Sequence, residues 1–255
     1  MNRVSPSWGW ADSPAAVVLS FLVPRPLIFT ATFNERGNVE AWVRGSHRAC
    51  PDADLLVIDD SSPDGTGRLL EEIAQEAPYL RLIHRSEKQG LASAHVMAMR
   101  FAQENSYDLL VTMDADGSHQ AWQIPELLRA ARDVDFVIGT RYRGGHHRAG
   151  TGRRLLSWGA NSAARALLPT GLSEYTTSFR VFNPTARDVV LNASLHDEGY
   201  AFFLEVVEAI HQAGLTVAEV PIEFLDRVYG SSKIPRAQIM TSMGVLITLW
   251  TERLT

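Results

Sequence analysis

Short apolar runs alternate with amphipathic stretches through the first half of the chain. The runs predicted to form strands are Leu27–Thr32, Asp54–Ile58, Leu80–His84, Leu109–Met113 and Phe136–Gly139. The stretches predicted to form helices are Asn38–Arg48, Gly67–Glu76, Ala92–Glu104 and Ile124–Arg132. Strands that alternate with helices are typical of βαβ units and of a mostly parallel sheet. We therefore predict a Rossmann-like α/β fold in which ligands bind beyond the carboxyl ends of the strands.

The second half of the chain is less regular. A helix is predicted from Arg153 to Leu168, with an apolar and a polar stripe on different faces. The apolar stripe contains Leu156, Ala160, Ala163 and Leu167, and the polar stripe contains Arg154, Ser157, Asn161 and Arg165. A further helix is predicted from Tyr200 to Gln212. Val217–Leu225 is strand-like, and Pro221 within it indicates an edge strand or a bulge.

The ends of the chain are interpreted as extensions of one central domain. Residues 1–24 are predicted to be an N-terminal extension, 25–233 the domain, and 234–255 a C-terminal amphipathic helix. No run of about 20 apolar residues occurs, so no membrane-spanning helix is predicted. Ala237–Thr251 contains no charged residue. This segment fits either a helix docked on the core or a helix lying in a lipid interface.

Composition narrows the possible partners. The 255 residues include one cysteine, Cys50, which cannot form an intrachain disulfide and is compatible with a reducing cytoplasm. The net charge of -5 argues against nucleic acid as a partner, because domains that bind it usually carry a basic excess. Phe136 to Ser173 contains no acid but holds Arg141, Arg143, Arg148, Arg153, Arg154 and Arg165, with His146 and His147. This block is either a solvated surface or an anion-binding site.

Polar and acidic residues follow the predicted strands. They are Asn34-Glu35 after the first strand, Asp59-Asp60 after the second and Asp114-Ala115-Asp116 after the fourth. Two carboxylates at this spacing suit a hard divalent cation that also binds a nucleotide diphosphate. Acids gathered without a metal or a cationic partner would repel one another. His119 is either a ligand or a structural residue. No glycine-rich dinucleotide or P-loop motif is present, which argues against an oxidoreductase or a kinase.

Several of these segments resemble the ordered motifs of a known family. Ala31-Thr32-Phe33-Asn34-Glu35, Ile58-Asp59-Asp60-Ser61-Ser62-Pro63-Asp64-Gly65 and Met113-Asp114-Ala115-Asp116-Gly117-Ser118-His119 resemble motifs of dolichol-phosphate mannose synthases and related polyprenyl-phosphate glycosyltransferases of family 2. The resemblance continues through Gly139-Thr140-Arg141-Tyr142, Arg153-Arg154, Ser178-Phe179-Arg180 and Arg227 to Lys233, and covers Leu27 to Lys233.

The resemblance implies a GT-A nucleotide-diphospho-sugar transferase fold and a set of residue roles. The nucleoside would contact Ala31, Phe33, Glu35, Ile58 and Asp60. The metal, Mg2+ or Mn2+, and the diphosphate would be held by Asp114 and Asp116, with Ala115 lining the nucleotide-sugar site. The donor phosphates and sugar would contact Arg141, Arg227 and Lys233. The acceptor phosphate would be bound by Arg153, Arg154 and Ser157.

The activity implied is an inverting transfer of mannose from the nucleotide-sugar donor GDP-mannose to a polyprenyl phosphate acceptor. An ionised phosphate needs no strong base, so the catalytic residues expected are Asp116, Arg141, Arg227 and Lys233. Two alternatives remain at this point. One is transfer from UDP-glucose, UDP-N-acetylglucosamine or another donor, to a polyprenyl phosphate or a specialised acceptor. The other is a weakened or non-catalytic paralogue that binds nucleotide or lipid phosphate or partners an integral membrane protein. The enzyme is expected to be cytoplasmic and peripheral at the inner face of the membrane, contacting the membrane surface or an integral membrane partner.

Some positions depart from the family pattern. Ala31 replaces a proline, Ala92 and His95 replace a glycine and a tyrosine, and Gln120-Ala121 replaces a proline-containing turn. Glu174 begins a segment, Glu174-Tyr175-Thr176-Thr177-Ser178-Phe179-Arg180, that differs from the common D-x-T-S-G-F-R. These changes predict either an altered substrate or reduced activity.

Overall fold

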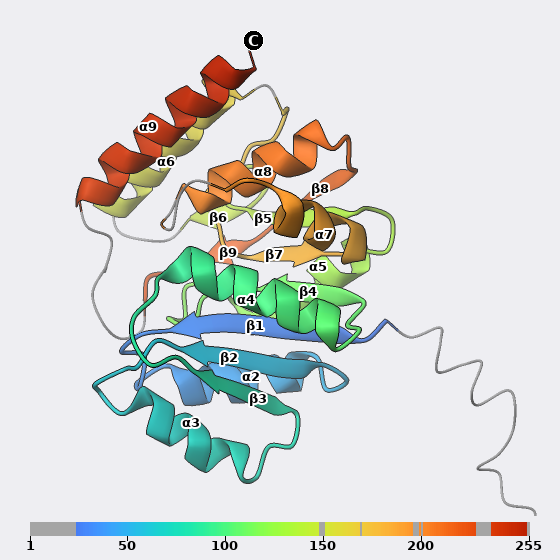
Figure 1. The fold of residues 1–255 in the computed structure, drawn as a ribbon, viewed down its shortest axis with the longest axis vertical. Helices are drawn as coiled ribbons and strands as arrows, with labels where there is room; N and C mark the ends of the chain where they lie inside the picture. Colours follow the sequence, from blue (N-terminus) through green and yellow to red (C-terminus); the bar gives the residue numbers. More distant parts are fainter. Residues whose placement is uncertain are drawn as a thin grey trace, which may run out of the picture.

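The computed structural model describes residues 24–147, 151–168, 170–195, 199, 201–227 and 236–253 (Figure 1). For residues 147, 151–156, 236–242 and 252 only the main chain is described. Residues 1–23 of the predicted extension, Tyr200 and Lys233 lie outside the described residues.

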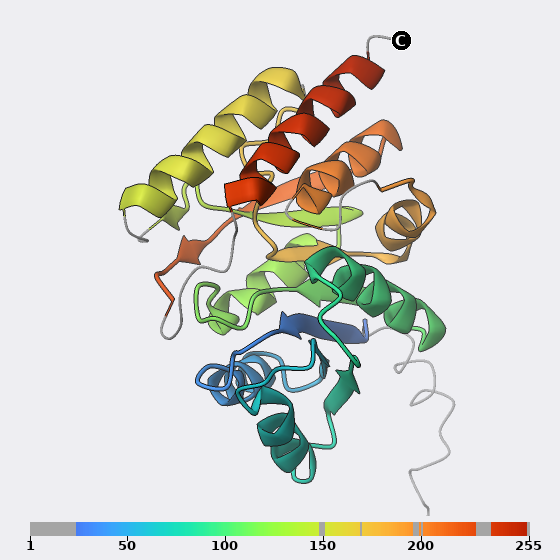
Figure 2. The ribbon, with the colours of Figure 1, turned by 60° about the vertical axis from the view of Figure 1, so that its left-hand side comes forward.

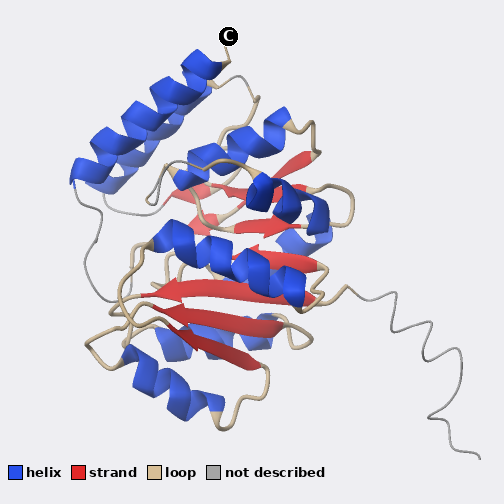
Figure 3. Ribbon diagram, viewed as in Figure 1, coloured by secondary structure: helices blue, strands red, loops and turns tan. Residues whose placement is uncertain are grey.

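Within the described residues, seven strands form one sheet in the order β3-β2-β1-β4-β7-β5-β8 (Figures 1 and 3). They are β1 Pro26–Thr32, β2 Asp54–Asp59, β3 Leu80–His84, β4 Leu109–Thr112, β5 Phe136–Thr140, β7 Arg180–Phe182 and β8 Val217–Pro221. Neighbouring strands are parallel except for β7, which is antiparallel to both β4 and β5. The predicted mostly parallel sheet is confirmed, and β8 lies at its edge as Pro221 indicated.

Helices cover both faces of the sheet (Figure 3). They are α2 Val39–Ala49, α3 Thr66–Ala74, α4 Leu91–Glu104, α5 Ile124–Ala130, α6 Thr151–Leu167, α7 Pro184–Asn192, α8 Phe202–Gln212 and α9 Arg236–Glu252, with a 3-10 turn at Ala121–Gln123. Successive side chains along a strand point to opposite faces of the sheet. Leu27 and Phe29 of β1 belong to the core under α4, α7 and α8, whereas Ile28 belongs to the core under α2, α3 and α5. The sheet is therefore a rigid support buried on both faces.

The strand β7 changes what reaches the carboxyl edge of the sheet. Because β7 is antiparallel, its first residue, Arg180, pairs with Thr112 of β4 and Ile138 of β5, near the ends of those strands. The segment that precedes β7 therefore arrives at the same edge as the loops that follow the parallel strands. Beyond β8, a two-stranded sheet of β6 His146–His147 and β9 Glu223–Phe224 continues this edge.

Helices α6 and α9 lie side by side at one end of the molecule (Figure 2). Leu246 and Leu249 of α9 are buried in the core, and the guanidinium of Arg253 makes two bonds of 2.5 and 2.6 Å to Glu208 of α8. Met243, Ile247 and Trp250 are exposed, so the outward side of this predicted amphipathic helix carries apolar side chains beside the exposed Thr248 and Thr251. No helix in the described parts of the chain is long and apolar enough to cross a membrane.

The faces of α6 differ from the prediction. Asn161, expected on an outward polar stripe, is fully buried together with Ala164 and Leu168. Ala163 of the expected apolar stripe is only half-buried. A buried amide is tolerated because each of its polar atoms is hydrogen-bonded, as described below.

Candidate active site

The loops at the carboxyl edge are tied to one another by hydrogen bonds between strands. The Asp60 amide donates to the carbonyl of Thr32 at 2.9 Å, joining the loops after β2 and β1. The Ser178 hydroxyl donates to Asp114 Oδ1 at 2.6 Å, joining the segment before β7 to the loop after β4. The Leu225 amide donates to the carbonyl of Ser118 at 3.0 Å. The predicted site residues that these segments carry are therefore gathered at one rim.

The two acids after β2 have different roles. Asp59 is buried and accepts hydrogen bonds from Thr32 Oγ1 at 2.8 Å, the Ser62 amide at 3.0 Å and Ser62 Oγ at 2.6 Å. These bonds hold a turn in which Ser61 has a φ of 56°. Asp59 therefore shapes the loop and has its oxygens occupied by the chain itself.

Asp60 forms a buried ion pair with Arg85, a residue that the sequence argument did not select. The Arg85 guanidinium contacts Asp60 Oδ1, and the Gly90 amide donates to Asp60 Oδ2 at 3.2 Å. Arg85 also donates to Ser93 Oγ at 2.6 Å and to the Gly90 carbonyl at 2.8 Å. The cationic partner required for this acid is thus Arg85, and the pair fixes the loop after β3 beside the predicted nucleoside position.

The remaining residues predicted to contact the nucleoside lie along the ends of β1 and β2. The ring of Phe33 is half-buried, with the Lys88 ammonium 4.2 Å from its centre. Glu35 accepts a hydrogen bond from Asn38 Nδ2 at 2.7 Å. Ala31 is half-buried at the end of β1, and the side chain of Ile58 is fully buried in the core. A ligand contact at Ile58 would therefore use its main chain.

The acidic pair after β4 presents two unlike carboxylates. The Asp114 side chain is 40% exposed, and the Ser178 bond orients it. Asp116 is buried; its Oδ1 accepts from the Ser118 amide at 3.0 Å, and its Oδ2 lies 2.8 Å from Nε of Arg227. Ala115 between them is buried. The structure thus brings Arg227, predicted from a distant segment, into direct contact with the acidic motif.

His119 supports this motif from within. It is buried between the rings of Phe179 and Phe224, whose centres lie 5.2 and 5.3 Å away. The Asp114 amide donates to its Nδ1 at 3.1 Å, so Nε2 carries the proton and faces Thr177 Oγ1 at 3.3 Å. Burial lowers the pKa of His119 below its ordinary value even though acids are nearby. Both ring nitrogens of His119 thus face partners within the protein, an arrangement that favours a structural residue over a ligand.

The donor set at Asp114 and Asp116 fits a hard divalent cation. Among the described residues no group of three or more His, Cys, Asp or Glu side chains is gathered for a metal. Mg2+ commonly binds through one or two carboxylates and completes its shell with water and substrate phosphates. Two carboxylates of which one is substantially exposed match that arrangement, so these residues would hold a metal together with a diphosphate.

Arg141 is buried and bound to Glu174. Its Nε donates to Glu174 Oε2 at 2.7 Å, and its Nη2 donates to Glu174 Oε1 at 2.8 Å and to Thr176 Oγ1 at 2.7 Å. The guanidinium also lies 5.0 Å from the ring of Phe224, the ring that contacts His119. Arg141 therefore belongs to the same cluster of side chains as the acidic motif. Its charge is paired with Glu174, a residue that the sequence indicated only as a departure from the family pattern.

The predicted acceptor residues lie on α6. Ser157 Oγ is 3.1 Å from the hydroxyl of Tyr142, which also accepts from Asn161 Nδ2 at 3.1 Å. These bonds attach α6 to the residue that follows Arg141. The main chain of Arg153 and Arg154 is part of α6, whereas their side chains lie outside the described ones. Lys233 lies beyond the described residues, so its predicted contact with the donor stays a prediction.

A buried arginine organises the segment before β7. Arg180 is 1% exposed and donates to the carbonyls of Thr177 at 2.8 Å, Tyr175 at 2.7 Å and Phe203 at 3.0 Å. Burial lowers the pKa of Arg180 to about 9. Since this segment supplies Glu174 and Ser178, Arg180 is a structural anchor for two site contacts.

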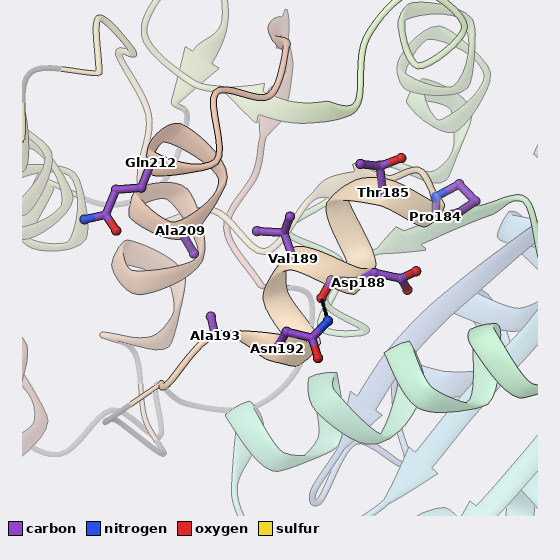
Figure 4. A pocket seen from close by; sticks show the side chains of 8 residues that line it. All are labelled: Pro184, Thr185, Asp188, Val189, Asn192, Ala193, Ala209 and Gln212. Carbon is purple, nitrogen blue, oxygen red and sulfur yellow. Dashed lines mark hydrogen bonds between the residues drawn. The ribbon is translucent and has the colours of Figure 1, made fainter.

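A separate hollow between α7 and α8 is lined by Pro184, Thr185, Asp188, Val189, Asn192, Ala193, Ala209 and Gln212 (Figure 4). It is distant from the acidic rim in the topology, because α7 follows the end of β7 and β7 is antiparallel to its neighbours. Its lining combines small, aliphatic and amide side chains with one acid. None of the predicted site residues contributes to it.

Comparison with known proteins identifies relatives that match most of the chain. The model of glycosyl transferase family 2 matches residues 27–190. An undecaprenyl-phosphate mannosyltransferase from Micrococcus luteus is 36% identical over 229 residues, which cover 89% of this chain and 93% of the relative. A polyprenol monophosphomannose synthase from Mycolicibacterium smegmatis is 37% identical over 239 residues, which cover 92% and 89%. A mannosyltransferase from Pyrobaculum calidifontis, solved with GDP-Man and Mn2+, has a similar fold, with a TM-score of 0.61 at 18% identity over 91% of this chain and 64% of that one.

Proposed function

Because the chain belongs to glycosyl transferase family 2, we propose that it transfers mannose from GDP-mannose to a polyprenyl monophosphate and inverts the anomeric carbon. The observation that carries the proposal is the contact of Asp116 with Arg227 at the rim where α/β folds bind ligands. The two relatives named for mannose and polyprenyl substrates support the choice of donor and acceptor.

The donor end of the reaction uses the residues around Asp116. Asp114 and Asp116 would hold Mg2+ or Mn2+, which when bound neutralises charge on the departing diphosphate. Arg227 already contacts Asp116 and so stands beside the phosphates that Asp116 would help to hold. Lys233 completes the proposed set of cations by resemblance. Phe33, Glu35 and the Asp60 loop form the proposed nucleoside end.

The acceptor end needs an anion site but no general base. A phosphate monoester is mostly ionised near pH 7, with a second pKa of about 6. One of its oxygens attacks the anomeric carbon, the bond from that carbon to the diphosphate oxygen breaks, and the diphosphate leaves with the electron pair. A single displacement inverts the configuration, so an α-linked donor gives a β-linked polyprenyl phosphosugar. Arg153, Arg154 and Ser157 on α6 would bind the acceptor phosphate.

A transfer assay tests this function. The purified chain is incubated with labelled GDP-mannose, Mn2+ and polyprenyl phosphate, and the organic phase is counted. We expect label in that phase, loss of it with EDTA, and loss of about a hundredfold or more in Asp116→Asn. UDP-glucose and UDP-N-acetylglucosamine are run in parallel. Transfer from a UDP-sugar alone would replace the proposed donor, and no transfer from any donor would overturn the function.

The acceptor assignment has its own test. Replacing Arg154 with alanine should raise the KM for polyprenyl phosphate about tenfold or more while the KM for GDP-mannose changes little, because an arginine makes charge-assisted bonds to phosphate oxygens. An unchanged acceptor KM would remove Arg154 from the proposed site.

The outer surface of α6 and α9 is proposed to contact the membrane that contains the lipid acceptor. Trp158 of α6 is 56% exposed, and Met243, Ile247 and Trp250 of α9 are 40, 52 and 40% exposed. Such side chains bury themselves in the interfacial region of a bilayer. The exposed Arg165 belongs to the acid-free block of residues 136–173, which would attract anionic headgroups.

Vesicle flotation tests this surface. Wild type should float with vesicles that contain phosphatidylglycerol, and Ile247→Ser/Trp250→Ser should float several-fold less. Trp122→Ser is the matched control, because Trp122 is 62% exposed but precedes α5. Equal flotation of all three proteins would overturn the lipid surface. Binding restricted to native membranes that retain their proteins would replace the lipid with an integral membrane partner.

A further inference from the structure

Glu174 is an acid enclosed within the protein at the edge of the proposed site. Its side chain is fully buried, and its two oxygens accept from Arg141 Nε and Nη2 at 2.7 and 2.8 Å. Glu174 Oε1 also accepts from the amides of Tyr175 and Thr176, at 3.1 and 2.9 Å. Burial alone would raise the pKa of Glu174, but Arg141 and these hydrogen bonds outweigh it and hold the pKa below its ordinary value. Glu174 therefore faces Arg141 as a carboxylate whose charged form is stabilised by that guanidinium.

The geometry of this pair restricts how Arg141 can meet a ligand. An arginine has five N–H groups: one on Nε and two on each terminal nitrogen. Glu174 takes one from Nε and one from Nη2, and Thr176 Oγ1 takes a second from Nη2. The two remaining N–H groups are both on Nη1. The planar guanidinium is held along the edge formed by Nε and Nη2. A ligand can therefore accept hydrogen bonds only from Nη1.

The surrounding contacts hold the pair in place. Thr176 Oγ1 accepts from Asn161 Nδ2 at 3.1 Å, and Asn161 Oδ1 accepts from the Tyr175 amide at 2.7 Å. Asn161 thereby connects α6 to both residues that follow Glu174. On the other side, Glu219 Oε1 accepts from the Glu174 amide at 3.0 Å. The segment that carries the Glu174 carboxylate is thus held from α6 and β8 before any substrate binds.

We propose that Glu174 is a positioning residue that fixes the guanidinium plane of Arg141, so that Nη1 is presented in one orientation to the phosphates of the donor. The inference rests on the proposed function of Arg141 at the donor. An unrestrained arginine would lose side-chain entropy on each binding event, and a fixed one avoids that cost. Pairing with Glu174 lowers the net positive charge that Arg141 offers to the ligand, but it fixes the direction in which the remaining N–H groups of Arg141 point. A fixed direction matters most for a group that stabilises charge in a transition state.

A double-mutant cycle measured by calorimetric binding of GDP in the presence of Mn2+ tests the proposal. Glu174→Gln should weaken binding about tenfold or more, since removing one member of a buried charge pair releases the other from its position. Arg141→Met should also weaken it. The double variant should bind no more weakly than Arg141→Met, because Glu174 acts through Arg141. Thermal unfolding of each variant shows whether it is folded.

Several outcomes would overturn the proposal. Additive losses would mean that Glu174 acts independently of Arg141, and unchanged affinity in Arg141→Met would remove Arg141 from the donor. A gain of affinity in Glu174→Gln would mean that the acid competes with phosphate for the guanidinium. If wild type binds no GDP with Mn2+, the proposed function itself fails. If wild type binds and Glu174→Gln binds equally well, only this inference fails.

Two further variants separate positioning from general loosening of the segment. Glu219→Gln removes a nearby negative charge that does not contact Arg141 but keeps a side-chain oxygen able to accept from the Ser173 and Glu174 amides, so it should bind GDP within about twofold of wild type. A loss equal to that of Glu174→Gln would overturn the proposal. If Glu174→Gln does not fold, Thr176→Val removes the second contact of Nη2 without removing a charge. It should weaken binding several-fold, and unchanged affinity would overturn the proposal.

Discussion

The ion pair of Arg85 with Asp60 gives the sharpest stability prediction. The two side chains are only 2 and 7% exposed, so neither charge is well solvated in the absence of the other. Arg85→Met leaves Asp60 buried beside an apolar side chain and also removes the bonds to Ser93 and the Gly90 carbonyl. Breaking a buried pair in this way costs about 3–5 kcal/mol. We expect that loss in the free energy of unfolding, which for a domain is about 5–15 kcal/mol in total.

The measurement is urea unfolding at pH 7 followed by circular dichroism, with the slope m compared between variants. At about 2–4 °C per kcal/mol for a domain of this size, the melting temperature should fall by roughly 6–20 °C. Arg68→Met is the control: Arg68 pairs with Glu72 but is 84% exposed, and its loss should cost at most about 0.5 kcal/mol. Asp60→Asn/Arg85→Met should recover much of the stability. A cost below about 1 kcal/mol for Arg85→Met would refute the reasoning.

Three further predictions concern other buried contacts. Burial lowers the pKa of His95 to about 3. Between pH 6.5 and 3 the unfolded chain therefore binds a proton at this residue and the folded chain does not, so the free energy of unfolding should fall as the pH drops through that range. His95→Phe should flatten that slope in urea unfolding at several pH values; an unchanged slope would contradict it. Arg253→Met should lower the melting temperature by several degrees by leaving Glu208 unpaired, whereas an unchanged value would show that α9 docks without this pair. Ser178→Ala should raise the Mn2+ concentration for half-maximal transfer about tenfold because Asp114 loses its orienting bond, and an unchanged Mn2+ dependence would exclude that role.

The fold was largely predictable because its strands are buried on both faces and therefore appear as continuous apolar runs. The run Leu80–His84 matches β3 at both ends. β7 was missed because it has three residues and begins with the buried Arg180, which no apolar pattern indicates. α7 had a readable signal: Asn183 precedes Pro184, and Asn183 Oδ1 accepts from the Ala186 amide as a helix N-cap.

The family assigned from the motifs is confirmed, whereas the individual roles of the site residues stay predictions. Sequence order located the acids because each follows a strand, but it could not show which cation each acid meets. Asp60 meets Arg85 and Asp116 meets Arg227, and these pairs are 25 and 111 residues apart in the numbering of the chain. Such pairing depends on strand order. Glu174 was visible only as a departure from a motif, since its function requires the tertiary position of Arg141.

The direction of β7 has a practical consequence for protein engineering. Val181 pairs with Val111 of β4 and with Val137 of β5, so β7 is fixed between two strands that run the other way. Residues 173–179 carry Glu174, Thr177 and Ser178 to the site as one continuous segment, and any exchange of this segment among homologous enzymes must keep Tyr175 and Phe179, whose side chains are buried in the core.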